Sequence, residues 1–138
     1  MAKQFWINLP VKDVSKSKEF FTKIGFALNP QYSNGSDSAS FLIGEQKVVM
    51  MLFSESTFEG FTRNSVADTK QSTEILLSID AQSAEEVDEI AKKAEMAGGS
   101  VFGKPGLAHG WMYSCGFTDL DGHRWNVLHM DMSKMPRG

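Results

Sequence analysis

The sequence predicts an α+β fold made of two tandem βαβββ units, because a strand-like pattern occurs twice and a helix signal follows each copy. Apolar residues alternate along both copies, at a constant offset of 68 positions. The two sets are Ile7, Leu9 and Val11, and Ile75, Leu77 and Ile79. Asp13 and Ser83, residue types that cap helix starts, follow the two sets. A repeat of this length indicates duplicated supersecondary units, and pseudo-symmetric copies tend to enclose a cleft.

The composition is that of one ordinary domain over residues 1–138. With 138 residues, 41% of them apolar, the chain can build a core, whereas each half alone would be marginal. The net charge of −3 gives no electrostatic footprint for nucleic acid. No stretch approaches the roughly 20 apolar residues of a membrane span, no signal peptide is recognisable, and the single cysteine favours a cytoplasmic location. The expected divisions are unit one at about 4–53, a linker at 54–72, unit two at about 73–130 and a tail at 131–138.

Unit one is predicted to begin with a strand over Phe5–Val11. Trp6 and Asn8 lie on the strand face opposite the alternating apolar residues. Asp13 is then expected to cap a helix that Gly25 ends. Three strands should follow, at about Ala27–Gln31, Ala39–Ile43 and Lys47–Phe53, with turns at Asn34-Gly35 and Gly44-Glu45.

The polar segment 54–72 separates the two units. A loop of this length is typical of a linker or of a lid over a site. Phe58 and Phe61 are its large apolar residues, and we favour a linker in which both pack against the fold.

Unit two is predicted to begin with a strand at Glu74. Ser83 and Glu86 have the spacing of a capping box for a helix to about Ala97, and Gly98-Gly99 ends it. Strands are expected near Ser100–Phe102, Trp111–Thr118 and Arg124–Met130, with a turn at Asp119–Gly122.

An ordered set of motifs accompanies this repeat. These are the run from Asn8 to Asp13, the pair Phe20-Phe21, the pair Gly25-Phe26 and the turn Asp119–Gly122. Together they resemble the vicinal-oxygen-chelate superfamily of glyoxalases, bleomycin-resistance proteins and extradiol dioxygenases, and most closely its small lactoylglutathione-lyase-like proteins. The resemblance implies that each unit curls into a half-cup, that paired half-cups form an incomplete barrel around a ligand cleft with helices outside, and that the protein is a homodimer.

The same resemblance implies four metal positions, on the first and last strands of each unit. They fall at Trp6, Met51, Glu74 and Asn126. Tryptophan has no lone pair to donate and methionine offers only a soft thioether, so these residues are a poor ligand set. The three histidines occupy none of the four positions: they are His109, His123 and His129. We therefore predict no cofactor, with a divalent metal as the disfavoured alternative.

The remaining candidates are polar residues expected on the cleft face. Glu74 is a candidate acid/base or ligand contact, and its alternative is a structural or rim carboxylate. By strand parity Arg124 and Asn126 share one face, and Asn8 and Asn126 are amides that could orient a ligand. Cys115 is expected to be buried and inert, because no cationic partner for its thiol is evident.

Three functions are compatible with these observations. The first, which we favour, is binding of a small organic molecule in the cleft without a metal. The candidate contacts are Trp6, Asn8, Met51, Glu74, Arg124 and Asn126. The second is a metal-dependent glyoxalase-type lyase or isomerase, or an extradiol-type dioxygenase, with non-standard ligands. The third is a structural domain whose cavity is packed shut. The expected partners are a small molecule and a second copy of the chain, with neither nucleic acid nor membrane.

Overall fold

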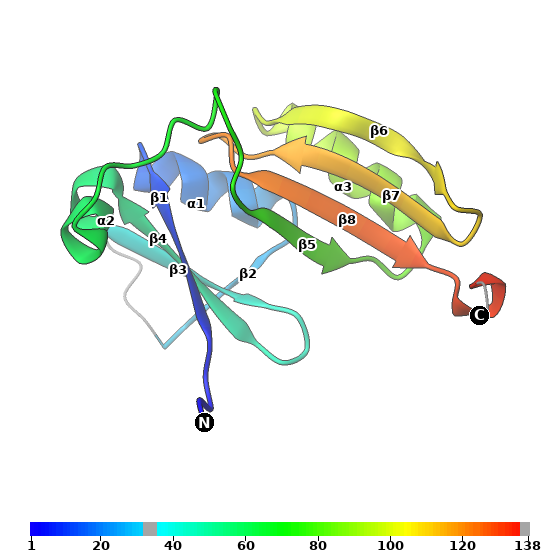
Figure 1. Cartoon of the computed structure of the whole chain (residues 1–138), viewed down its shortest axis with the longest axis horizontal. Helices are drawn as coiled ribbons and strands as arrows, with labels where there is room; N and C mark the ends of the chain where they lie inside the picture. Colours follow the sequence, from blue (N-terminus) through cyan, green and yellow to red (C-terminus); the bar gives the residue numbers. More distant parts are fainter. Residues whose placement is uncertain (32–35, 136–138) are drawn as a thin grey trace. The chain divides into compact units, whose positions relative to one another are not determined.

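The structure is a computed structural model that describes residues 1–31 and 36–135, and its chain forms two compact units (Figure 1). Unit 1 is Met1–Lys70 and unit 2 is Gln71–Gly138. Each unit contains one four-stranded sheet, and three α-helices occur in the described residues. The predicted α+β class with two repeated units is confirmed. The predicted turn at Asn34-Gly35 lies outside the described residues.

Unit 1 is built around sheet A, whose strand order is β1-β4-β3-β2. Its elements are β1 (Trp6–Val11), α1 (Val14–Lys23), β2 (Ala27–Leu28), β3 (Ser38–Ile43), β4 (Val48–Ser54) and α2 (Glu55–Thr62). Strands β1 and β4 are parallel, and the other pairs are antiparallel. Helix α1 is the crossover that such a parallel pair requires, and it covers one face of the sheet (Figure 1).

Helix α1 forms where the sequence places a cap and an apolar stripe. The Asp13 carboxylate accepts a hydrogen bond from the Lys16 backbone N–H at 3.0 Å. Gly25 ends the helix with a φ of +106°, a conformation that side chains with a Cβ rarely adopt. Phe20 and Phe21 are fully buried against the sheet and pack edge-to-face, with centroids 5.2 Å apart. The core of unit 1 therefore lies between α1 and sheet A.

Alternation along the strands leaves a second set of side chains on the opposite face of sheet A. We call it the α2 face, because α2 lies at one end of it. Met50 and Leu52 of β4 are buried toward α1, so their neighbours Met51 and Phe53 belong to the α2 face. The α2 face comprises Trp6, Asn8, Pro10, Ser38, Ser40, Leu42, Val49, Met51 and Phe53.

Unit 2 repeats this plan around sheet B, whose order is β5-β8-β7-β6. Its elements are β5 (Leu76–Asp80), α3 (Ala84–Met96), β6 (Ser100–Ala108), β7 (Met112–Thr118), β8 (Arg124–Met130) and the short 3₁₀ helix η1 (Met132–Lys134). Strands β5 and β8 are parallel, and α3 packs on one face of sheet B (Figure 1).

The predicted start of α3 is confirmed, with one change in its capping box. The Ser83 hydroxyl accepts from the Glu86 backbone N–H at 3.1 Å. The Glu86 carboxylate accepts in return from the backbone N–H of Gln82, one residue before the cap. The bond to Ser83 satisfies one of the backbone donors that a helix start leaves without partners, and the bond from Gln82 ties the preceding residue to the first turn.

A buried carboxylate fixes the turn between β7 and β8. Asp119 is only 4% exposed and accepts from the backbone N–H groups of Asp121 and His123 at 3.0 and 3.1 Å. Its second oxygen lies 3.1 Å from the Trp125 indole nitrogen and 2.9 Å from His123 Nδ1. Four hydrogen bonds to one side chain explain how this carboxylate tolerates burial.

Several predicted boundaries are wrong. Strand β1 begins at Trp6, and the preceding Phe5 is 68% exposed. Strand β5 begins at Leu76, so Glu74 lies before the strand and not within it. Strand β2 ends at Leu28, well before the predicted Gln31, although the Asn29 backbone N–H still donates to the Ser40 carbonyl oxygen of β3 at 2.9 Å.

Two segments that were predicted as loops have regular structure. Residues Glu55–Thr62 of the predicted linker form α2. Strand β6 continues to Ala108 although it contains Gly103, Pro105 and Gly106, because bulges shift its register against β7 and accommodate them. No helix in residues 1–31 and 36–135 has the length and apolar character needed to span a membrane.

Candidate functional site

The three unit-1 candidates lie together on the α2 face. Asn8 of β1 is the direct register partner of Met51 on β4, so their side chains are neighbours. Trp6 lies two residues before Asn8 on the same strand and face, beside Val49. Trp6 is 43% exposed and Asn8 is exposed as well, so both present side-chain surface to solvent. Strand parity assigned Trp6 and Asn8 to this face correctly.

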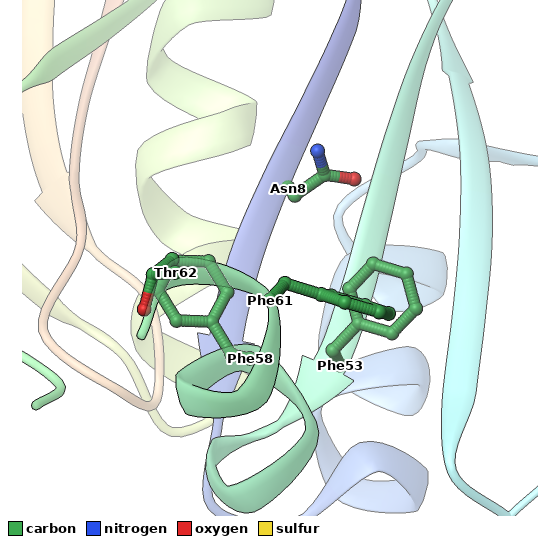
Figure 2. Close-up of a pocket in the computed structure, with 5 residues that line it drawn as sticks. All are labelled: Asn8, Phe53, Phe58, Phe61 and Thr62. Carbon is green, nitrogen blue, oxygen red and sulfur yellow. The ribbon is translucent and has the colours of Figure 1, made fainter. Parts of the chain in front are cut away.

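Helix α2 and sheet A enclose a cavity next to Asn8. Its volume is about 370 Å³, and its lining is Asn8, Phe53, Phe58, Phe61 and Thr62. Figure 2 shows Asn8 on β1 and Phe53 on β4, with the Phe61 ring of α2 directed at Phe53 and with Phe58 and Thr62 on the same helix. We call this cavity the phenylalanine pocket. Its size is in the range of small-molecule sites, and its surface is mostly apolar with one amide.

The aromatic walls of the phenylalanine pocket contact each other directly. The rings of Phe53 and Phe61 meet edge-to-face, with centroids 5.1 Å apart and planes at 81°. Phe61 nevertheless remains 68% exposed, so much of its ring is available to a bound molecule. An exposed aromatic ring beside an amide is a surface that a ligand could cover with a gain in hydrophobic free energy.

Helix α2 is held at both of its ends. It starts immediately after β4, where the Ser54 hydroxyl donates to Thr57 Oγ1 at 3.0 Å. It ends at Arg63, which adopts the left-handed conformation with a φ of +55°. The Val66 backbone N–H then donates to a Glu59 carboxylate oxygen at 3.0 Å and ties the following chain back onto the helix.

The unit-2 candidates lie on or near the face of sheet B opposite α3. Arg124 and Asn126 alternate with the buried Trp125 and Val127 of β8, which confirms that they share a face. The Arg124 guanidinium lies over the ring of Phe102, a residue that was not among the candidates.

The remaining unit-2 candidates have different surroundings. Asn126 lies in register between Ser78 of β5 and Gly116 of β7. Glu74 is exposed and precedes β5.

The four positions at which the resemblance implies a metal do not supply a suitable donor set. Trp6 offers an indole N–H, Met51 a thioether, Asn126 an amide oxygen and Glu74 the single carboxylate. Within residues 1–31 and 36–135, no three His, Cys, Asp or Glu side chains gather as a metal site. The residues present therefore do not fit the divalent metal of this fold family.

The histidines and the cysteine of unit 2 have structural surroundings. His123 contacts Asp119, and His129 Nδ1 lies 3.1 Å from the carbonyl oxygen of Ala81. Cys115 is 3% exposed with its Sγ 3.8 Å from the carbonyl oxygen of Val87. Burial, with a smaller contribution from the charge of Asp88, raises the pKa of this thiol to about 11. A thiol that stays protonated is a poor nucleophile, in agreement with the sequence-based expectation.

Sequence reasoning missed the phenylalanine pocket because it depends on α2. One local signal was present: Phe58 and Phe61 are spaced three residues apart, which places them on one side of a helix. Ser54 followed by Glu55 is also a typical helix start.

Comparisons with known proteins agree with the fold. Residues 3–127 match the family model of the Glyoxalase/Bleomycin resistance protein/Dioxygenase superfamily. The chain is similar to the structure of hypothetical protein SA1046 from S. aureus, with 31% identity over 93% of this chain and 94% of that chain and a TM-score of 0.80. Comparison with curated proteins gives no significant match.

More distant structures share the fold alone. One is a glyoxalase/bleomycin resistance protein/dioxygenase family enzyme from Burkholderia phytofirmans PsJN, with 15% identity, 91% and 97% coverage of the two chains and a TM-score of 0.76. Another is a glyoxalase-related enzyme from Fulvimarina pelagi, with 17% identity, 92% and 88% coverage and a TM-score of 0.77.

Proposed function

Because the chain belongs to the glyoxalase/bleomycin resistance protein/dioxygenase superfamily, we propose that it binds a small organic molecule in the phenylalanine pocket without the metal of that fold family. The observation that carries this proposal is the cavity of about 370 Å³ between α2 and sheet A. Three phenylalanines line it, and one amide lies beside them. The unsuitable donor set at the four metal positions supports a metal-free mode of binding.

The lining suggests the class of ligand. Phe53, Phe58 and Phe61 offer apolar and edge-on aromatic contacts, which suit an aromatic ring. The Asn8 amide can both donate and accept a hydrogen bond, so it suits a neutral polar group on that ring. The lining contains no charged side chain. The favoured ligand is therefore a neutral aromatic molecule with one amide or hydroxyl group.

The sequence-derived contact residues extend this proposal. Trp6 and Met51 continue the α2 face beyond Asn8, and they are proposed to contact larger ligands. Glu74, Arg124 and Asn126 remain proposed contacts from unit 2. For Glu74 the expected result is specific: Glu74→Gln should weaken binding and leave the melting temperature almost unchanged, because the residue is exposed. A large loss of stability without an effect on binding would make Glu74 structural.

The proposal is tested by thermal unfolding of the intact chain with benzamide and benzyl alcohol as probes. A ligand that binds only the folded state, at about ten times its Kd, should add about 1.4 kcal/mol to the free energy of unfolding and raise Tm. Phe61→Ala removes an exposed ring and should weaken binding about tenfold. Asn8→Leu should weaken the binding of benzamide more than the binding of toluene, because toluene forms no hydrogen bond with Asn8.

Leu107→Ala is the matched control, since Leu107 is an equally exposed apolar residue of unit 2. It should leave probe binding unchanged. If neither probe nor their larger homologues raise Tm, the cavity does not bind such ligands and the proposal fails in favour of a structural role.

An enzymatic role is the alternative, and the Glu74 carboxylate at one of the four metal positions is the observation that favours it. Its form would be a lactoylglutathione-lyase-like reaction or an extradiol-type oxidation that requires a divalent metal. Metal content decides between the two functions. Stoichiometric metal in protein purified without chelators, or uptake of added nickel, zinc, manganese or iron, would support the enzyme and contradict metal-free binding.

The proposal includes a homodimer in the cytoplasm. The dimer follows from the family resemblance, and the location from the single free and buried cysteine, which suits a reducing compartment. Light scattering on the purified chain measures the first: a mass of about twice 15.3 kDa is expected, and a mass near 15.3 kDa would exclude a stable dimer. Cell fractionation measures the second.

A further inference from the structure

A second cavity lies on unit 1, and its chemistry differs from that of the phenylalanine pocket. It has a volume of about 570 Å³ and lies where β1 and β4 begin. Its walls come from the N-terminal segment Lys3–Trp6, from the stretch Asn29–Gln31 after β2, and from the turn and strand start at Gln46–Val49. None of its lining residues belongs to the phenylalanine pocket.

The charge of this cavity is its distinctive property. Lys3 and Lys47 are among its lining residues, and none of the lining residues that the structure describes carries a carboxylate. This is notable in a chain with a net charge of −3. Glu45 lies in the same turn as Lys47 but is not part of the lining. The local charge therefore favours an anion, although the whole protein repels one.

The rest of the lining combines aromatic rings with a fixed polar floor. Phe5 and Trp6 are 68% and 43% exposed, so both rings can cover a planar guest. Asn29 is only 2% exposed, and its amide nitrogen donates to Ser40 Oγ at 3.2 Å. Its side-chain oxygen accepts from the backbone N–H of Gln31 at 3.1 Å. These bonds hold the floor in place without a ligand, which lowers the cost of binding.

The position of Lys47 is also defined by its backbone. Its N–H donates to the Gly44 carbonyl oxygen at 3.1 Å, which closes the turn between β3 and β4. Lys47 has a φ of +54°, and it is one of the residues that line the cavity.

We infer that this cavity binds a small planar organic anion, with a carboxylate between Lys3 and Lys47 and an aromatic ring against Phe5 and Trp6. The site goes beyond the proposed function, because it takes a charged ligand and shares only Trp6 with the contacts proposed above. Its volume is in the range that holds a two-ring aromatic acid.

The test compares 2-naphthoate with its neutral analogue 2-naphthamide, each titrated into the ¹⁵N-labelled chain at low ionic strength. Naphthoate should shift the amide signals of residues 3–6 and 46–49 and the Trp6 indole signal. Naphthamide should bind at least about fivefold more weakly, since it lacks the charge. Raising the salt concentration should weaken the binding of naphthoate but not that of naphthamide, because salt screens exposed charges.

The variants separate this cavity from nonspecific attraction. The double substitution Lys3→Gln and Lys47→Gln should lower the affinity for naphthoate about fivefold and leave the affinity for naphthamide unchanged. The matched control is Lys16→Gln with Lys92→Gln, which changes the net charge equally at two exposed lysines of α1 and α3. It should leave naphthoate binding intact.

Three results would overturn the inference. The first is no shift of these signals by naphthoate, and the second is equal affinity for naphthoate and naphthamide. The third is naphthoate shifts centred on Asn8, Phe58 and Phe61. That third result would instead support the proposed function, so the two proposals can fail independently.

Discussion

The guanidinium of Arg124 lies over the ring of Phe102, with Cζ 4.5 Å from the ring centroid. The same ring covers Gly116 of β7: a Cβ added at Gly116 would meet two atoms of it at 2.5 Å. A cation above an aromatic face is attracted by the ring quadrupole, at about 0.5–1 kcal/mol for exposed pairs. Gly116 thus leaves the space in which the Phe102 ring can lie flat on sheet B with the Arg124 guanidinium above it.

Gly116→Ala should therefore displace the Phe102 ring. We expect a loss of about 1 kcal/mol in the free energy of unfolding, at the low end for overpacking, because the ring is half-exposed and can move. Urea unfolding measures this loss. In the background of Phe102→Ala the same substitution should cost much less. If Gly116→Ala costs the same stability in both backgrounds, the absence of a side chain at Gly116 does not serve to make room for the Phe102 ring.

His123 should make the stability of unit 2 depend on pH. Burial by itself lowers its pKa, but the hydrogen bond and charge of Asp119, with the charge of Asp121, outweigh burial and leave the pKa above 6.5. A raised pKa means that the folded state holds the proton more tightly. The resulting stabilisation is fully present below pH 6.5 and is lost as the pH rises through the folded-state pKa.

His123→Gln should accordingly cost more stability at pH 5.5 than at pH 8.5, as measured by urea unfolding at both values. His109→Asn is a suitable control, because His109 is exposed and has a φ of +58°, which asparagine tolerates. A cost for His123→Gln that is the same at both pH values would contradict the ion pair with Asp119.

Cys115 should not react with thiol reagents in the folded protein. Its pKa of about 11 leaves little thiolate at pH 8, and its side chain is almost fully buried. Labelling with Ellman's reagent should reach one thiol per chain in denaturant and proceed only at the rate of unfolding without it. Rapid labelling of native protein would show that the segment of β7 around Cys115 opens locally.

Alanine substitutions at two glycines of unit 1 should change the free energy of unfolding in opposite directions. Gly60 lies inside α2 with open space around it and has an ordinary φ, so Gly60→Ala should add about 0.5–1 kcal/mol through helix propensity. Gly25 also has open space, but its φ is +106°, so Gly25→Ala should cost about 1 kcal/mol. Unfolding free energies of both variants give the comparison, and a loss of stability at Gly60 would indicate that α2 needs its flexibility.

The sequence predicted best where local signals agree. Helices α1 and α3 have side-chain caps at Asp13 and Ser83 and glycines with positive φ after their ends, and their bounds were close to those predicted. Strand β8 has the predicted bounds, Arg124–Met130. Alternation along β1 also assigned Trp6 and Asn8 to the correct face, since the period of a strand leaves only two choices.

The errors arise where distant contacts decide. Helix α2 is only eight residues long, too short to form on propensity alone, and its Phe61 packs on Phe53 of the sheet. The phenylalanine pocket depends on that contact, so no local pattern could define it. Strand β6 tolerates Gly103 and Gly106 because β7 supplies a partner across the bulges. The repeat offset made Glu74 the unit-2 equivalent of Trp6 on the first strand, but β5 starts two residues later, at Leu76.

The junction of β4 and α2 limits how the phenylalanine pocket can adapt. Ser54 ends β4 and Glu55 begins α2, so no intervening residue can act as a hinge between the strand and the helix. Swinging α2 outward would have to pull on β4, whose two neighbours in sheet A are β1 and β3. The helix is thus a fixed wall and not a lid. Ligands of different shape must therefore be accommodated by rotation of the Phe58 and Phe61 side chains. We expect the pocket to tolerate differences in ligand length better than differences in ligand width.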